Sequence, residues 1–294
     1  MSITISEINS QPDAWRTGLG LSEAAAPLLR RPGERMLVIG CGTSAFMAES
    51  VSVLREDAGF GLTDYGYASE PRRPRDYDVV LGISRSGDTT EVVDALRSLP
   101  AGVRRAVVTG VADSPCATLA DDLLVLDFAD EQSVVQTRFP TTFLLLARAV
   151  LGEDVDRLPD AVAAALETEP AVLDVAGYDH FVYLGRGWTN GLAKEAALKI
   201  REAAQAWAES YPMLDYRHGP LAVAHPGSLV WLLGPDDPEL RAQVEATGAT
   251  AVAGLAPDPL VELVLAQRLA VRLAEARGLN PDRPRHLTRA VVLS

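Results

Sequence analysis

Four hydroxyl side chains surround a single glycine in the stretch GISRSGDTTEVVDAL, where an apolar run changes into a helical pattern. The hydroxyls belong to Ser84, Ser86, Thr89 and Thr90. A helix N-terminus presents unpaired N–H groups and the positive end of the helix dipole, so it attracts anions. Hydroxyl donors at the same place, with Gly87 allowing close approach of the backbone, favour a phosphate monoester. A plain helix cap is the alternative, with Asp88 as N-cap and Glu91 as its capping-box partner.

A second loop, GCGTSA at residues 40–45, also follows an apolar run. It matches the Gly-x-Gly-x-x-Ala fingerprint of dinucleotide-binding folds, with Asp64 at a plausible distance for the ribose. That interpretation predicts a NAD-linked oxidoreductase, but it gives the hydroxyl stretch no role. The other interpretation treats Thr43 and Ser44 as further donors to the same anion. The Walker pattern is absent, which argues against binding of a nucleoside triphosphate.

Composition narrows the class of protein. The chain has 294 residues, 48% of them hydrophobic, and a formal net charge of −13. An acidic surface repels nucleic acid, so no nucleic-acid partner is expected. Neither Cys41 nor Cys116 belongs to a CxxC pair, so neither a disulfide framework nor a zinc site is expected. The first residues lack a signal-peptide pattern, and no apolar run reaches the ~18 residues of a membrane span. These features predict a cytoplasmic location with no membrane partner.

Short apolar strands alternate with amphipathic helices along the whole chain, which predicts an α/β fold with parallel sheets covered on both faces. The predicted strands are residues 36–39, 79–83, 106–109, 123–126, 181–184, 229–233 and 251–253. A polar stretch follows a helix at about 138–151, after which the alternation restarts. The prediction is therefore two doubly wound, flavodoxin-like α/β/α subdomains in tandem. The predicted limits are 1–35 for an N-terminal helical segment, then 36–152 and 153–294 for the two subdomains.

The two halves resemble copies of each other. MLVIGCGTS at 36–44 corresponds to FVYLGRGWT at 181–189, and both combine a strand with Gly-x-Gly. The counterpart of the hydroxyl stretch is SLVWLLGPDDPEL at 228–240, which has lost the hydroxyls and carries Asp236 and Asp237 instead. Only the first copy is therefore expected to bind an anion.

Seven ordered motifs resemble those of double SIS (sugar isomerase) domain proteins, in particular the isomerase half of glucosamine-6-phosphate synthase and stand-alone phosphosugar isomerases and deaminases. The motifs are EINSQPDAW (7–15), GCGTS (40–44), ISRSGDTTE (83–91), EQSVVQTRFPTT (131–142), LAKEAALKIREAA (192–204), RHGPLA (217–222) and PRHLTRAV (284–291). The resemblance extends from about residue 7 to the C-terminus. It implies a homodimer with a shared active site, in which the HGP histidine reaches into the partner's pocket.

The resemblance also implies roles for individual side chains. Ser84, Ser86 and Thr89 become phosphate ligands, Arg85 contributes its backbone N–H, and Thr43 and Ser44 contact phosphate or sugar. Gln136 and Thr137 fall where the family places sugar-contacting residues, although Gln136 replaces a more usual small hydroxyl residue.

The catalytic residues implied by the resemblance are Glu202, the base that moves a proton between C1 and C2, and His218, which acts in ring opening. Lys199 lies three residues before Glu202 and could orient it or stabilise an oxyanion. Helical periodicity alone gives a different interpretation, because Glu195, Lys199 and Glu202 fall opposite the apolar stripe. It predicts a solvated face with an i,i+4 pair between Glu195 and Lys199.

Two departures from the family limit the expected chemistry. Arg289 occupies the place of a tail lysine that forms a Schiff base, and an arginine cannot serve as that nucleophile. The sequence enters the sugar-binding module at once, so glutamine-dependent synthesis is not expected. The predicted function is a sugar 6-phosphate isomerase or aminosugar-phosphate deaminase that needs no cofactor and no metal. The alternative is a non-catalytic sugar-phosphate sensor that acts through a protein partner.

Overall fold

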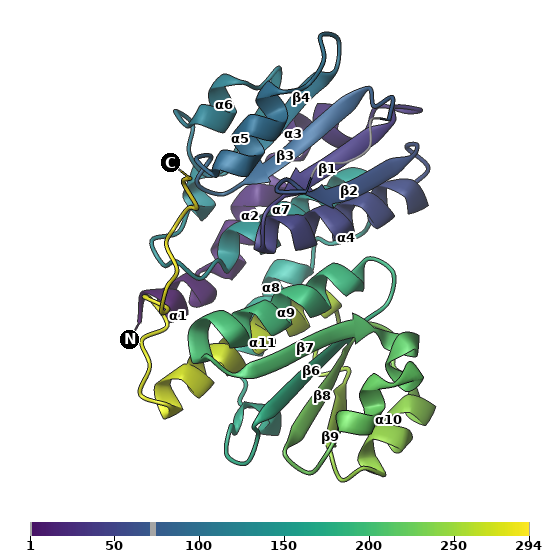
Figure 1. The fold of residues 1–294 in the computed structure, drawn as a ribbon, viewed down its shortest axis with the longest axis vertical. Helices are drawn as coiled ribbons and strands as arrows, with labels where there is room; N and C mark the ends of the chain where they lie inside the picture. Colours follow the sequence, from purple (N-terminus) through teal and green to yellow (C-terminus); the bar gives the residue numbers. More distant parts are fainter. Residues whose placement is uncertain (1, 71–74, 294) are drawn as a thin grey trace. The chain divides into compact units, whose positions relative to one another are not determined.

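The computed structural model describes residues 2–70 and 75–293 (Figure 1). The contacts divide the chain into two compact units that interleave along the sequence. One unit contains residues 10–132 and 138–159 and the chain from Thr288 on. The other contains the chain up to Asn9, residues 133–137 and residues 160–287. From the strands found in the described residues, we call them the five-stranded unit and the four-stranded unit.

The sheet of the five-stranded unit is parallel throughout, with strand order β2-β1-β3-β4-β5. Its strands are β1 (Met36–Gly40), β2 (Thr63–Tyr67), β3 (Val79–Ser84), β4 (Arg104–Thr109) and β5 (Asp122–Val125). Its helices are α2 (Gln11–Leu19), α3 (Ser22–Leu29), α4 (Thr43–Asp57), α5 (Thr90–Arg97), α6 (Pro115–Thr118) and α7 (Arg138–Leu151), with a 3-10 turn η1 (Asp127–Ala129). α4 packs on β1 and β2, whereas α5 and α6 pack on β3 and β4. Because strand side chains alternate between faces, Leu37 and Ile39 meet the α5 residues Val92 and Leu96 in one core cluster.

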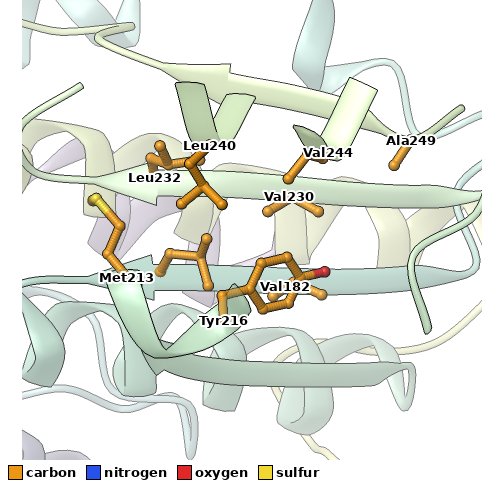
Figure 2. Packing of buried hydrophobic residues seen from close by; sticks show 9 residues of the cluster. Val182, Met213, Tyr216, Val230, Leu232, Leu240, Val244 and Ala249 are labelled. Carbon is orange, nitrogen blue, oxygen red and sulfur yellow. The ribbon is translucent and has the colours of Figure 1, made fainter. Parts of the chain in front are cut away.

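The four-stranded unit has a second parallel sheet, with strand order β7-β6-β8-β9. Its strands are β6 (His180–Gly185), β7 (Trp207–Pro212), β8 (Ser228–Leu233) and β9 (Thr250–Ala253). Its helices are α1 (Ile3–Asn9), α8 (Leu158–Leu166, which starts at the unit boundary), α9 (Thr189–Ala204), α10 (Pro238–Glu245) and α11 (Pro259–Ala276), with 3-10 turns η2 (Ala171–Leu173), η3 (Met213–His218) and η4 (Pro220–Val223). α9 packs against α11, β6 and β7. The strand side chains Val182, Val230 and Leu232 belong to a separate core cluster that includes residues of η3 and α10 (Figure 2).

The predicted fold class is confirmed, and each predicted strand corresponds to an observed one. The prediction missed β2 and β7. Both are edge strands of mixed composition, TDYGY and WAESYP, whereas the central strands β1, β3, β6 and β8 are buried along their whole length. Strands buried on both faces produce continuous apolar runs, and edge strands need not. The predicted domain limits stay a prediction. They divide the chain into continuous segments, whereas each compact unit is made of several separate segments.

A search of the described residues for a helix long and apolar enough to cross a bilayer finds none.

Candidate functional site

The two predicted anion-binding loops lie at the carboxyl ends of neighbouring strands in the five-stranded unit. β1 and β3 pair in parallel, from Met36 against Val79 to Ile39 against Gly82. The strand order reverses between them, and open α/β sheets bind their ligands at such a reversal. The hydroxyl side chains assigned to this end of the sheet are buried or half-buried: Thr43, Ser44, Ser84, Ser86 and Thr89. The structure therefore brings the residues of both loops to one end of one sheet.

The loop from Ser84 to Thr89 is shaped by its own serines. The Gly87 N–H donates to Ser84 Oγ at 3.1 Å, and the Asp88 N–H donates to Ser86 Oγ at 3.2 Å. A hydroxyl that accepts a hydrogen bond keeps its own hydrogen, so accepting these N–H groups leaves the Ser86 donor for an anion, whereas the Ser84 hydroxyl also bonds to Cys116. The capping interpretation is wrong in its details: α5 begins at Thr90, its N-cap is Thr89 without a side-chain cap, and Asp88 is exposed.

Position 87 requires a glycine for two reasons, which are its backbone conformation and the lack of room for a side chain. Its φ of +69° lies in the left-handed region that side chains rarely adopt. A Cβ at this position would lie 2.0 Å from Ser114 Oγ and 2.3 Å from Ser114 Cβ. Any larger residue therefore moves the loop or the N-terminus of α6.

If this loop is the phosphate site, Gly87→Ala is expected to weaken binding of inorganic phosphate by about 10- to 100-fold. Displacing the loop removes hydrogen bonds to a charged group, each worth about 1.5–3 kcal/mol. Titration calorimetry measures the loss. Gly102→Ala is the matched control, because Gly102 also has a positive φ, of 96°, but a Cβ there meets nothing within 4 Å. If both variants bind phosphate alike, the loop is not the phosphate site.

The C-terminal tail lies against the start of α5. The Thr90 N–H donates to the Val291 carbonyl at 3.2 Å, and the Leu293 N–H donates to Thr90 Oγ1 at 3.0 Å. The Arg85 side chain is buried, and its Nη2 donates to the Arg289 carbonyl at 2.8 Å. From sequence only the backbone N–H of Arg85 was assigned a role. Its side chain in fact fixes the tail beside the loop.

The guanidinium of Arg289 is paired with a carboxylate of the same unit. Its Nη2 donates to Asp130 Oδ1 at 2.6 Å and also contacts Asp130 Oδ2. This pair joins the tail to the residue that follows η1.

In the four-stranded unit, Lys199 lies between two carboxylates of its own helix. Its Nζ is 3.2 Å from Glu195 Oε1 and 2.7 Å from Glu202 Oε2. The exposed fraction of the side chain is 1% for Lys199, 0% for Glu195 and 19% for Glu202. The solvated-face interpretation is therefore wrong, because Lys199 and Glu195 are buried although they lie opposite the apolar stripe. The i,i+4 pair between Glu195 and Lys199 is present, but it is buried.

Lys199 is held in its charged form. Burial lowers the pKa of its ammonium group, but the charges and hydrogen bonds of Glu195 and Glu202 outweigh burial, and the net pKa is raised above the ordinary value. A lysine of this kind is a poor amine nucleophile near neutral pH. It is suited instead to orient the Glu202 carboxylate and to stabilise negative charge.

The four-stranded unit also contains the two predicted sugar-contacting residues. Gln136 Oε1 is buried, and within residues 2–70 and 75–293 it has no hydrogen-bond partner. A buried acceptor without a donor costs free energy, so this oxygen is a candidate partner for a ligand hydroxyl. Thr137 is fully buried, and its carbonyl accepts a hydrogen bond from Gln267 Nε2 at 3.3 Å.

His218 is the last residue of η3 and is exposed. Within the described part of the chain its side chain makes no hydrogen bond or ion pair, so it is available for proton transfer. The phosphate loops thus belong to the five-stranded unit, and Gln136, Thr137, Lys199, Glu202 and His218 belong to the four-stranded unit.

The oxidoreductase interpretation needs Asp64 to lie near the loops, and the structure does not place it there. Asp64 is the second residue of β2, paired with Leu37 near the amino end of β1, and so lies far from the strand ends that carry the loops. Its carboxylate binds Arg75 and the Tyr77 hydroxyl, both at 2.6 Å. A cavity of about 770 Å³ does open on this unit, and it is lined by Leu37, Ile39 and Val80. None of the predicted phosphate ligands lines it.

Comparisons with known proteins agree with this geometry. Residues 28–150 match the model of the SIS domain family. The chain is homologous to glutamine–fructose-6-phosphate aminotransferase (isomerizing) from Methanothermobacter thermautotrophicus, with 27% identity over 98% of the chain. It spans 57% of the length of that relative.

Solved structures of similar fold cover nearly the whole chain. Glucosamine-6-phosphate deaminase from Thermotoga maritima superimposes with a TM-score of 0.80 and 27% identity, over 99% of this chain and 100% of that one. Tagatose-6-phosphate ketose/aldose isomerase from Escherichia coli also gives a TM-score of 0.80, at 21% identity, over 100% and 96% of the two chains. At that lower identity the likeness concerns the fold alone.

Proposed function

We propose that this protein is an isomerase or deaminase of sugar 6-phosphates. The observation that carries the proposal is the buried arrangement of Glu195, Lys199 and Glu202, in which a charged lysine holds a partly accessible carboxylate. A solvated helix face has no need of such an arrangement, and proton transfer at a sugar carbon needs a positioned base. The hydroxyl loops at the strand reversal supply a matching site for the phosphate.

In this proposal the phosphate binds to the loop of Ser84, Ser86 and Thr89, with Thr43 and Ser44 beside it. His218 assists opening of the sugar ring. Glu202 then removes the proton from C2 of the open aldose and returns it to C1, the hydroxyl proton of O2 passes to O1, and Lys199 stabilises the negative charge that develops on oxygen in between. With a 2-amino sugar the same shift produces a C2 imine. Water hydrolyses this imine to the ketose phosphate and ammonia.

The proposal includes a homodimer. A residue that completes the site of a neighbouring subunit must be exposed, and its side chain must not be bonded within its own subunit. Among the described residues, His218 meets both conditions. A shared site of this kind is also what the family resemblance implies. Mixing Glu202→Gln and His218→Asn chains tests it: a shared site recovers part of the activity, whereas separate sites recover none.

The function is tested by a thermal-shift screen of hexose and aminosugar 6-phosphates, followed by assays of ketose formation and ammonia release. Stabilisation by at least one sugar phosphate, together with turnover of it, supports the proposal. Stabilisation without turnover of any member supports the sensor instead. Stabilisation by NAD but by no sugar phosphate contradicts both.

A further inference from the structure

The residue before His218 is fixed to helix α10 by three hydrogen bonds. Arg217 Nη1 is 3.3 Å from Asp237 Oδ2, and Arg217 Nη2 is 3.2 Å from Asp237 Oδ1. Its third donor, Nε, bonds to Gln243 Oε1 at 2.8 Å. A guanidinium that meets a carboxylate in this two-pronged way is held in orientation as well as in place.

The carboxylate in this contact is itself held by the backbone. Asp237 is the N-cap of α10, and its Oδ1 also accepts the Leu240 N–H at 2.9 Å. The hydrogen bond from Arg217 and the bond from Leu240 lower the pKa of Asp237, so it stays charged over the working pH range. This is the loop that lost its hydroxyls in the second copy. A helix N-terminus can attract a ligand anion, but at the N-terminus of α10 the carboxylate of Asp237 occupies that position.

The rest of η3 is anchored on both sides of the arginine. Met213 and Tyr216 are buried in the core cluster that includes Leu240 and Val244 of α10 (Figure 2). On the other side, Gly219 has a φ of +134°, which favours glycine and fixes the direction of the chain after His218. His218 thus extends into solvent from a segment whose neighbours are fixed.

We propose that Arg217, Asp237 and Gln243 form a clamp that positions His218 for ring opening. The inference rests on the proposed function and extends it to residues that touch neither the phosphate nor Glu202. Arg217 is a positioning residue in this scheme, because its donors are used by α10 and its effect passes through the adjoining backbone. Misplacement of a catalytic group by about 1 Å can lower a rate ~100-fold.

The test compares Arg217→Met, Asp237→Asn and the double variant in the full-length protein. Asparagine keeps an oxygen to cap α10, so Asp237→Asn removes the charge and spares the helix end. The matched control is Arg241→Met. Arg241, on the same helix, binds Asp236 in a similar two-pronged way, at 2.7 and 3.0 Å, so its hydrogen bonds go to Asp236 and not to the residues of the clamp.

Each single clamp variant is expected to lower kcat at least ~10-fold while KM changes less than ~2-fold. The double variant is expected to be no slower than Arg217→Met, because both changes break one contact. Arg217→Lys should recover part of kcat, and amide hydrogen exchange of residues 213–219 should quicken in the clamp variants but not in Arg241→Met.

Two outcomes would contradict the clamp without contradicting the proposed function. In the first, the losses in kcat of the two single variants multiply in the double variant. In the second, the clamp variants match Arg241→Met in both kcat and hydrogen exchange. A wild-type protein that turns over no sugar phosphate contradicts the proposed function and, with it, the role of His218. Exchange at 213–219 reports on the clamp even in that case, so the two failures are distinguishable.

Discussion

Glu202→Gln is expected to remove nearly all turnover while leaving sugar-phosphate binding nearly unchanged. Glutamine has the same shape as glutamate and can still accept a hydrogen bond from Lys199, so the local structure of α9 is kept. It cannot take a proton from carbon, and general-base catalysis contributes about 10²–10⁴-fold to a rate. We therefore expect kcat to fall ~1000-fold and the Kd of the sugar phosphate to stay within ~3-fold, measured by steady-state kinetics and by calorimetry.

The control for this variant is Glu275→Gln at the end of α11, where the glutamate is exposed. It makes the same chemical change at a surface site and is expected to keep full turnover. A Glu202→Gln protein that isomerises or deaminates at the wild-type rate would show that another group is the base. A protein that loses substrate binding instead would place Glu202 in recognition rather than in proton transfer.

The fold could be predicted from local patterns because its central strands are buried on both faces. When helical patterns separate apolar runs such as MLVI and VVLGI, the runs indicate strands of a parallel sheet that is covered on both faces. The adjacency of the two anion-binding loops followed as well, since both come after strands of one parallel sheet. β2 and β7 lie at sheet edges, where the sequence need not be apolar, and no local pattern distinguished them from loops.

The contacts that complete the candidate site depend on residues distant in the sequence. Arg85 and Arg289 are 204 positions apart, and no periodicity relates them. The burial of Lys199 was likewise hidden, because helical spacing describes one covered face and α9 is covered on more than one. Local patterns therefore predicted candidate site residues, and tertiary packing determined which of their side chains are buried and paired.

The two copies of the strand–loop–helix unit show how one backbone geometry serves two purposes. In the first copy, the end of β3 carries serine hydroxyls and Gly87, which we propose bind an external anion. In the second, Asp237 supplies the anion and binds Arg217. Under the proposed function, one copy binds the substrate and the other holds a catalytic side chain in place.

Lys199→Met is expected to destabilise the protein by about 3–5 kcal/mol at pH 7, because it removes one partner of a buried ion pair and leaves the Glu195 carboxylate without the charge of Lys199. The difference from wild type should depend on pH in one direction. Since the pKa of Lys199 is raised in the folded protein, its contribution is fully present below the ordinary lysine value of 10.5 and is lost as pH rises through the folded-state value. Urea unfolding from pH 7 to 11.5 should therefore show a constant gap that narrows only above about pH 10.5.

The double variant Glu195→Gln/Lys199→Met is the matched control for this argument. With the buried carboxylate neutralised, the missing cation is no longer needed, so most of the lost stability should return. Turnover should not return with it, because Glu202 has lost the ammonium group that orients it. If the single variant is as stable as wild type, water or another cation must reach Glu195, and the buried arrangement would not be what holds Glu202 in its position.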